Sequence, residues 1–138
     1  MCIRDRLQIE CAAYAYPWSR NIFKGCLRDD YCCRVLELDG EIAGYAIMSM
    51  GRNEAHLLNL CVDPGRHRMG LGDCLLNFML DFARNQKAET TFLEVRPSNE
   101  AARRFYEERG FVEVGMRTNY YPARFGREDA IIMAQETV

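Results

Sequence analysis

The chain has 138 residues, which is the size of one domain spanning residues 1–138. It carries 18 Lys and Arg against 20 Asp and Glu, a formal net charge of −2, and 49% of its residues are hydrophobic. This balance excludes a disordered tail and a collagen-like fibre, and the small charge argues against a general nucleic-acid binder. The longest apolar stretches, Tyr45–Met50 and Cys74–Leu80, fall far short of the ~18 residues that a membrane-spanning helix needs.

Seven cysteines suggest a disulfide framework at first, but their number is odd and no pair has C-x-x-C spacing. With only two histidines, His56 and His67, a zinc site is not expected either. The first residues lack the charged-then-apolar order of a signal peptide. We therefore expect free, mostly buried thiols and a cytoplasmic location. The cysteines are Cys2, Cys11, Cys26, Cys32, Cys33, Cys61 and Cys74.

The first half of the chain predicts one helix and three strands. Pro17-Trp18-Ser19 opens a helical stretch, in which the serine can accept hydrogen bonds from first-turn amides. Two strand-like runs, Cys32–Leu38 and Glu41–Met50, are separated by Asp39-Gly40, the strongest short signal for a hairpin. A third run, Ala55–Val62, ends just before a proline that stops strand pairing.

The second half predicts two helices with a strand between them. A helix over Leu71–Ala83 is followed by the strand Thr90–Val95 and by a second helix over about Asn99–Arg109. We expect Ser98 to cap this second helix and Gly110 to end it in a left-handed conformation. The first helix has an apolar stripe at spacings of three and four, formed by Leu71, Leu75, Phe78, Met79 and Phe82.

Two final strands, Phe111–Asn119 and Asp129–Gln135, enclose a long predicted loop, Tyr120–Arg127. Strands first, then two strand–helix units, then strands again favour a mixed sheet with helices on its faces. The sequence therefore predicts an α/β or α+β fold and not a helix bundle or a β-sandwich.

A glycine-containing loop, His67-Arg68-Met69-Gly70-Leu71-Gly72, joins a predicted strand to a predicted helix. Glycines let the amides at a helix start approach a phosphate, and Arg66 and Arg68 add positive charge. A Rossmann loop is excluded because Leu75 stands where its third glycine would be, and a Walker A loop because no Gly-Lys-Ser/Thr follows. From these residues alone, a phosphate cradle and a plain turn between strand and helix both remain open.

The loop resembles the acyl-CoA pyrophosphate loop, Gln/Arg-x-x-Gly-x-Gly/Ala, of the GNAT N-acetyltransferases, with His67 in the place of Gln or Arg. The resemblance runs from about Tyr16 to Ala134 and points to the RimI-type branch, which acetylates the N-terminal alanine of a small-subunit ribosomal protein. The matching segments are Asn59–Pro64, Leu93–Asn99, Tyr106-Glu107, Gly110-Phe111, Arg117–Pro122 and Gly126–Asp129.

The resemblance implies a GNAT-like, mostly antiparallel mixed sheet with helices on both faces, and acetyl-CoA as a co-substrate without a metal. Main-chain amides of the third strand would bind the pantetheine arm where that strand splays from the strand of Glu94. Asn99 resembles a contact to CoA and is equally able to cap its helix locally. The cofactor-binding residues implied in this way are Leu60, Cys61, Val62, Arg68, Met69, Gly70, Leu71, Gly72, Asp73 and Asn99.

Acetyl transfer from a thioester to an amine needs a proton acceptor for the amine and a proton donor for the departing thiolate. The resemblance implies that Glu94 is the base and that Tyr106 is the acid. The residues alone also allow simpler roles, because Glu94 could merely pair with Arg96 and Tyr106 could be a packed core tyrosine.

Other polar and reactive residues are less specific. Cys61 and His56 are five positions apart and should point to opposite faces of a strand, so Cys61 is interpreted as packing and not as a nucleophile. By resemblance, the loop Tyr120–Arg127 walls the groove for an acceptor peptide, although its aromatic residues could also plug the end of the sheet. Glu128 and Asp129 either attract a basic peptide or are simply solvated.

The leading hypothesis is a cytoplasmic N-terminal protein acetyltransferase, a monomer or weak dimer whose partners are CoA and the N-terminal segment of a ribosomal protein, without direct nucleic-acid or membrane contact. The alternatives are a GNAT enzyme acting on a small amine or another protein N-terminus, and a CoA-binding module without turnover. Family members begin with a strand and a helix, whereas Met1–Arg6 resembles nothing in them. We therefore expect residues 1–15 to be a non-native or truncated start, with the first strand missing.

Overall fold

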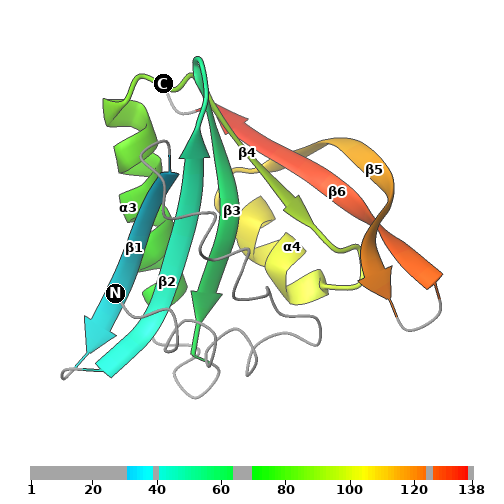
Figure 1. The fold of residues 1–138 in the computed structure, drawn as a ribbon, viewed down its shortest axis with the longest axis horizontal. Helices are drawn as coiled ribbons and strands as arrows, with labels where there is room; N and C mark the ends of the chain where they lie inside the picture. The colour runs from blue at the N-terminus through cyan, green and yellow to red at the C-terminus, as the bar shows by residue number, and fades with distance from the viewer. Residues whose placement is uncertain (1–30, 39–40, 64–69, 124–125, 137–138) are drawn as a thin grey trace.

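The computed structural model describes residues 31–38, 41–63, 70–123 and 126–136, which form a six-stranded sheet and two helices (Figure 1). The strand order is β1-β2-β3-β4-β6-β5. Only β3 and β4 pair in parallel among these strands, so the predicted mixed, mostly antiparallel sheet is confirmed. The elements are β1 (Tyr31–Leu38), β2 (Glu41–Met50), β3 (Glu54–Val62), α3 (Leu71–Asn85), β4 (Thr90–Val95), α4 (Glu100–Glu108), β5 (Val112–Ala123) and β6 (Gly126–Glu136).

Both described helices cover the same face of the sheet, behind the strands in Figure 1. Leu76 and Met79 of α3 and Tyr106 of α4 belong to one buried cluster with residues of β2, β3, β4 and β6. This cluster is the core of the described molecule. The helix predicted from Pro17-Trp18-Ser19, and with it the expectation of a helix on the other face, lies outside the described residues.

Two predicted local features are confirmed. β1 and β2 pair antiparallel from Tyr31 opposite Ser49 to Leu38 opposite Glu41, as a hairpin at Asp39-Gly40 requires, although these two turn residues are not themselves described. Gly110 has a φ of 96° after α4, the left-handed conformation that ends many helices.

The predicted apolar stripe of α3 is wrong at one position. The buried residues of the helix are Leu75, Leu76, Met79 and Ala83, whereas Phe78 is 50% exposed. The helix is thus rotated on the sheet by about one position from the predicted orientation. Phe78 instead lies near the surface with the guanidinium carbon of Arg34 5.7 Å from the centre of its ring.

The predicted cap of α4 is wrong by one residue. Asn99, and not Ser98, is the N-cap, because the Oδ1 atom of Asn99 accepts a hydrogen bond of 3.1 Å from the amide of Ala102. The side chain of Ser98 is engaged elsewhere, by Glu128. The alternative that Asn99 caps its own helix is therefore confirmed.

The long loop predicted over Tyr120–Arg127 is also wrong, since β5 continues to Ala123 and β6 begins at Gly126. The two strands pair on either side of a register shift that falls between Arg117 and Tyr121. A β-bulge of this kind absorbs extra residues without ending the ladder. The residues at the bulge have a composition typical of turns, so the sequence predicted a loop where the structure has a strand.

Candidate active site

The parallel pairing of β3 and β4 is short, and the two strands diverge beyond it. The pairs run only from Glu54 opposite Thr90 to Leu57 opposite Leu93. Leu58 follows at once and is an extra residue in the pairing of β3 with β2, a β-bulge that bends its strand. Figure 1 shows β3 and β4 separating toward their C-terminal ends. The splay expected from the resemblance is present.

The bulge at Leu58 also corrects the relation between His56 and Cys61. Their partners on β2, Ser49 and Tyr45, are four positions apart, so the extra residue places His56 and Cys61 on the same face and not on opposite ones. Four ladder positions still separate them by roughly 13 Å along the strand, too far for a Cys–His pair. Cys61 is only 2% exposed, and its interpretation as a packing residue stands.

The start of α3 holds the described part of the glycine loop. Gly70 is the N-cap with a φ of 74°, a left-handed conformation that glycine adopts without strain. A Cβ at Gly72 would lie 3.1 Å from the ring of Phe105, so this glycine also lets α3 and α4 approach closely. The predicted contacts of Arg68 and Met69 lie outside the described residues.

Asp73, a predicted cofactor-binding residue, is engaged by Arg109 at the end of α4. The guanidinium donates to both carboxylate oxygens of Asp73, from Nε to Oδ1 and from Nη2 to Oδ2 at 2.8 Å. It also stacks on the ring of Phe105, 3.8 Å from its centre. The hydrogen bond from Arg109 holds the pKa of the Asp73 carboxyl below its ordinary value. This pair joins the first turn of α3 to the last turn of α4.

Glu94 lies in β4 with 25% of its side chain exposed. The residues on either side of it point into the helix-covered core, so Glu94 faces the opposite side of the sheet. Its Oε1 atom lies 3.2 Å from Nε of Arg117, which comes from β5. The alternative partner, Arg96, pairs with Glu128 instead.

Tyr120 is the second side chain beside Glu94. Burial raises the pKa of the Tyr120 phenol, and so do the negative charge of Glu94 and a hydrogen bond to it, while Arg117 acts in the opposite direction. The guanidinium carbon of Arg117 also lies 5.4 Å from the centre of the Tyr120 ring. Glu94, Arg117 and Tyr120 thus form one cluster.

A pocket of about 400 Å³ includes this cluster. The stacked rings of His56 and Phe92, with centres 5.4 Å apart, contribute to its wall. Glu54 lies there too, with its Oε2 atom 3.3 Å from Nε2 of His56. The pocket therefore combines carboxylates with cationic and aromatic groups, which suits a polar ligand carrying an amine.

Tyr106, the predicted acid, is 8% exposed and packs edge-on against Phe105 and Phe111. Because α4 covers the face opposite to Glu94, the two predicted catalytic residues lie on opposite faces of the sheet. A substrate bound between the splayed strands would therefore have Glu94 on one side and Tyr106 on the other.

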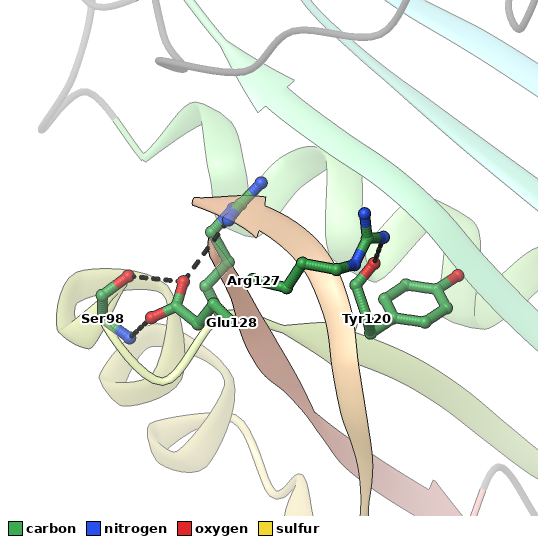
Figure 2. Close-up of polar contacts among 5 residues, drawn as sticks. Ser98, Tyr120, Arg127 and Glu128 are labelled. Atoms are coloured by element: carbon green, nitrogen blue, oxygen red, sulfur yellow. Dashed lines mark hydrogen bonds and ion pairs between the residues drawn. The ribbon is translucent and has the colours of Figure 1, made fainter. Parts of the chain in front are cut away.

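Glu128 and Asp129 are not simply solvated, because both carboxylates accept hydrogen bonds within the protein. Glu128 accepts hydrogen bonds from the amide of Ser98 at 3.1 Å and from its Oγ at 2.9 Å (Figure 2). Burial alone would raise the pKa of the Glu128 carboxyl, but the bonds from Ser98 and the contact with Arg96 lower it. Asp129 accepts from the amide of Asn119 at 2.8 Å.

Several of the pocket residues, among them Arg117, His56 and Phe92, are not identified from the sequence as parts of a site. Arg117 falls inside a matching segment, His56 enters only through the zinc and Cys61 considerations, and Phe92 lies within a predicted strand. Their common signal is that they share one face of the sheet with Glu94, and it requires the strand order to be known.

The described cysteines are free thiols: Cys32 and Cys61 are buried, Cys33 is half-buried and Cys74 is exposed. Within the described ranges, no group of three or more His, Cys, Asp or Glu side chains could hold a metal ion. Of the described helices, none has the length and hydropathy needed to cross a membrane.

The sequence of this chain is similar to those of known acetyltransferases. Residues 3–111 match the model of the Acetyltransferase (GNAT) family. The ribosomal protein bS18-alanine N-acetyltransferase of Escherichia coli K12 is 44% identical over 126 residues, which cover 91% of this chain and 85% of that protein.

Solved structures agree with the fold. The crystal structure of the ribosomal-protein-S18-alanine N-acetyltransferase from Escherichia coli superposes with a TM-score of 0.91 at 41% identity, covering 98% of this chain and 87% of that one. A Bacillus anthracis acetyltransferase structure in complex with acetyl coenzyme A shares the fold at 24% identity and a TM-score of 0.71, covering 80% of this chain and 64% of that one. The chain therefore belongs to the GNAT acetyltransferase family.

Proposed function

We propose that this acetyltransferase moves the acetyl group of acetyl-CoA to the α-amino group of an N-terminal alanine of a small-subunit ribosomal protein. The observation that supports it most is the position of Glu94, a partly exposed carboxylate in a pocket at the point where β3 and β4 diverge. The similarity to bS18-alanine N-acetyltransferases supports this choice of acceptor. An acceptor of this kind also supports a cytoplasmic location.

The start of α3 fits the diphosphate of the donor. Among the described residues, no side chain caps its first turn, and a Cβ at Gly70 would meet nothing within 4 Å. Amides at a helix start carry partial positive charge and favour an anion. We assign the diphosphate to the amides of Gly70, Leu71, Gly72 and Asp73, together with Arg68 and Met69, and a further contact to Asn99.

The pantetheine arm is assigned to the splay. Beyond the pair of Leu57 with Leu93 the ladder of β3 and β4 ends, and an extended ligand can add to a strand in the manner of another strand. In this proposal the main chain of Leu60, Cys61 and Val62 binds the arm and orients the thioester carbonyl, whose developing negative charge is stabilised by amide donors.

The chemistry then needs proton transfers both at the amine nitrogen and at the sulfur. An α-amino group has a pKa of about 7.7–8.0, so near neutral pH it must lose a proton to attack. We assign that proton to Glu94, directly or through one water molecule. The amine nitrogen bonds to the acetyl carbon, the carbon–sulfur bond breaks, and the Tyr106 hydroxyl protonates the thiolate. The attached nitrogen still carries two protons after attack and releases one of them to solvent as the amide forms, while Tyr106 regains a proton from solvent. The positions of the two residues on opposite sides of the sheet suit attack and departure on opposite sides of the acetyl group.

Mass spectrometry of an acceptor peptide tests the proposal. A basic peptide that begins with alanine, incubated with the protein and acetyl-CoA, should gain the mass of one acetyl group on its α-amine. The same peptide with a blocked α-amine is the control and should gain nothing. Acetylation confined to lysine side chains or to a polyamine would contradict the proposal. Protection of the fold by acetyl-CoA without transfer to any amine would indicate a CoA-binding module instead.

A further inference from the structure

We propose that Arg127 and Asp129 form a clasp that positions Tyr120, and through it the carboxylate of Glu94. The clasp holds the bulge of β5, residues 118–120, from the neighbouring strand β6. Arg127 and Asp129 are positioning residues in this scheme, because they contact the bulge and not the pocket. The inference deepens the proposed function, since it rests on Glu94 being the base.

Three hydrogen bonds define the clasp. The Nε atom of Arg127 donates to the carbonyl of Asn119 at 2.7 Å. Its Nη2 atom donates to the carbonyl of Tyr120 at 2.8 Å (Figure 2). In the preceding peptide, the Oδ1 atom of Asp129 accepts from the amide of Asn119 at 2.8 Å. One planar guanidinium thus binds two successive carbonyls, a fork that a lysine cannot reproduce.

The bulge needs such support. Between Arg117 and Tyr121 no residue of β5 is paired in the ladder with β6, so the strand itself does not fix Tyr120. Asn119 has a φ of 53°, a left-handed conformation that costs free energy in a non-glycine residue and persists only when its surroundings hold it. The clasp supplies those surroundings, and the bulge in turn directs Tyr120 toward Glu94.

The clasp uses side chains from only one side of β6, and Glu128 points to the other side. It lies between the two clasp residues, and successive side chains of a strand point to opposite sides. Accordingly Glu128 bonds to Ser98, in the turn that leads into α4, and not to the carbonyls that Arg127 binds (Figure 2). Replacing Arg127 should therefore leave the turn before α4 intact.

The titration of Tyr120 reports on the clasp without requiring any acetyl transfer. Tyr120 is faced by Glu94 from β4 and by Arg117 from its own strand, and Glu54 and His56 of β3 line the same pocket. If Arg127 acted on Tyr120 only as a nearby positive charge, its removal would raise the phenol pKa. If it positions the ring, its removal lowers the pKa, because Tyr120 moves away from Glu94 and into water.

The experiment is carbon-13 NMR of tyrosine-labelled protein, with the Tyr120 signal assigned by Tyr120→Phe. We expect Arg127→Ala to lower the Tyr120 pKa, Arg127→Lys to restore less than half of the difference, and Arg84→Ala to leave it unchanged. Arg84 is a matched control because it is an exposed arginine in an ion pair with Asp81, on α3. An unchanged or raised Tyr120 pKa in a folded Arg127→Ala protein would overturn the proposal.

A double-mutant cycle on acetyl transfer completes the test. Arg127→Ala should lower kcat about tenfold with the KM for acetyl-CoA within about twofold, and should have almost no further effect in a Tyr120→Phe background. Additive losses in kcat would show a role independent of Tyr120 and contradict the clasp. If no peptide is acetylated by the unchanged protein, the proposed function fails while the NMR result still decides the clasp.

Discussion

Arg117 reaches over β6 to Glu94, so two residues from strands that are not neighbours in the sheet form an ion pair of 3.2 Å. On the strand between them, Ile132 is paired with Glu94 and also lines the pocket. An amine that enters the pocket therefore meets a carboxylate already in contact with a guanidinium. Binding of the acceptor has to rearrange or share that contact.

Replacement of Glu94 tests its role as the base. We expect Glu94→Gln to lower kcat by about 100-fold or more, because an amide cannot accept the proton of the ammonium. Affinity for acetyl-CoA, measured by calorimetry, should change less than about twofold. Glu89→Gln, at an exposed position just before β4, is the control and should behave like the unchanged protein. Equal losses in kcat from both variants would remove Glu94 from the mechanism.

Tyr106 can be tested with little disturbance of the core. Tyr106→Phe keeps the ring that packs against Phe105 and Phe111, so the free energy of unfolding should fall by no more than about 1–2 kcal/mol. If the hydroxyl protonates the thiolate, kcat should fall by about 100-fold while acetyl-CoA still binds. Tyr31→Phe, on β1, is the matched control. A Tyr106→Phe enzyme with full kcat would leave this residue with a packing role only.

Gly44 of β2 tests how closely this strand packs against β3 and α3. A Cβ at this position would lie 2.8 Å from the carbonyl oxygen of Cys61 and 3.1 Å from a methyl of Leu75. Backbone cannot move aside cheaply, so Gly44→Ala should destabilise the protein by about 1–3 kcal/mol in urea unfolding. Gly115→Ala, whose Cβ would meet Ile132 at an ordinary 3.6 Å, should cost less than about 1 kcal/mol. Equal stabilities of the two variants would refute the clash.

The pair of Asp73 and Arg109 predicts a pH dependence of stability. Because Arg109 lowers the pKa of Asp73 in the folded state, the pair stabilises the protein above the ordinary aspartate pKa, near 4, and this contribution is lost as the pH falls through the lower, folded-state value. Asp73→Asn should therefore lower the melting temperature at pH 6 and have a smaller effect at pH 3.

The control for this pH dependence is Asp81→Asn on the same helix. Asp81 pairs with Arg84 at a site where 67% of its side chain is exposed, compared with 47% for Asp73. Exposed pairs contribute little, so Asp81→Asn should change the melting temperature only slightly at either pH. A loss from Asp73→Asn that is the same at pH 3 and pH 6 would show that the charge of Asp73 does not stabilise the fold.

Much of the fold could be predicted because its signals are local. Strand-like runs on either side of a two-residue turn signal identified β1 and β2, and the bounds of β2 and β4 agree with the prediction at both ends. Gly110 marked the end of α4 because few other residues adopt its conformation readily. The composition of the glycine loop likewise identified the start of α3.

The remaining features depend on contacts between distant residues. Nothing in the run 54–62 marks Leu58 as a bulge, because the extra residue is defined only by pairing with β2. The partner of Glu94 is 23 positions away, on a strand whose neighbours the sequence does not reveal. Asn119 and its neighbours were interpreted as loop because their composition suits a turn, whereas side chains of β6 hold them within a strand.

The single extra residue at Leu58 has a mechanical consequence for the whole domain. It limits the seam between two subassemblies, β1–β3 with α3 and β4–β6 with α4, to four paired positions. On the helix side the same two subassemblies meet again at Gly72 and Phe105 and at the Asp73–Arg109 pair. Any change in the angle between the two halves must bend this short seam and slide one helix end over the other, so a molecule wedged between β3 and β4 acts on both halves at once.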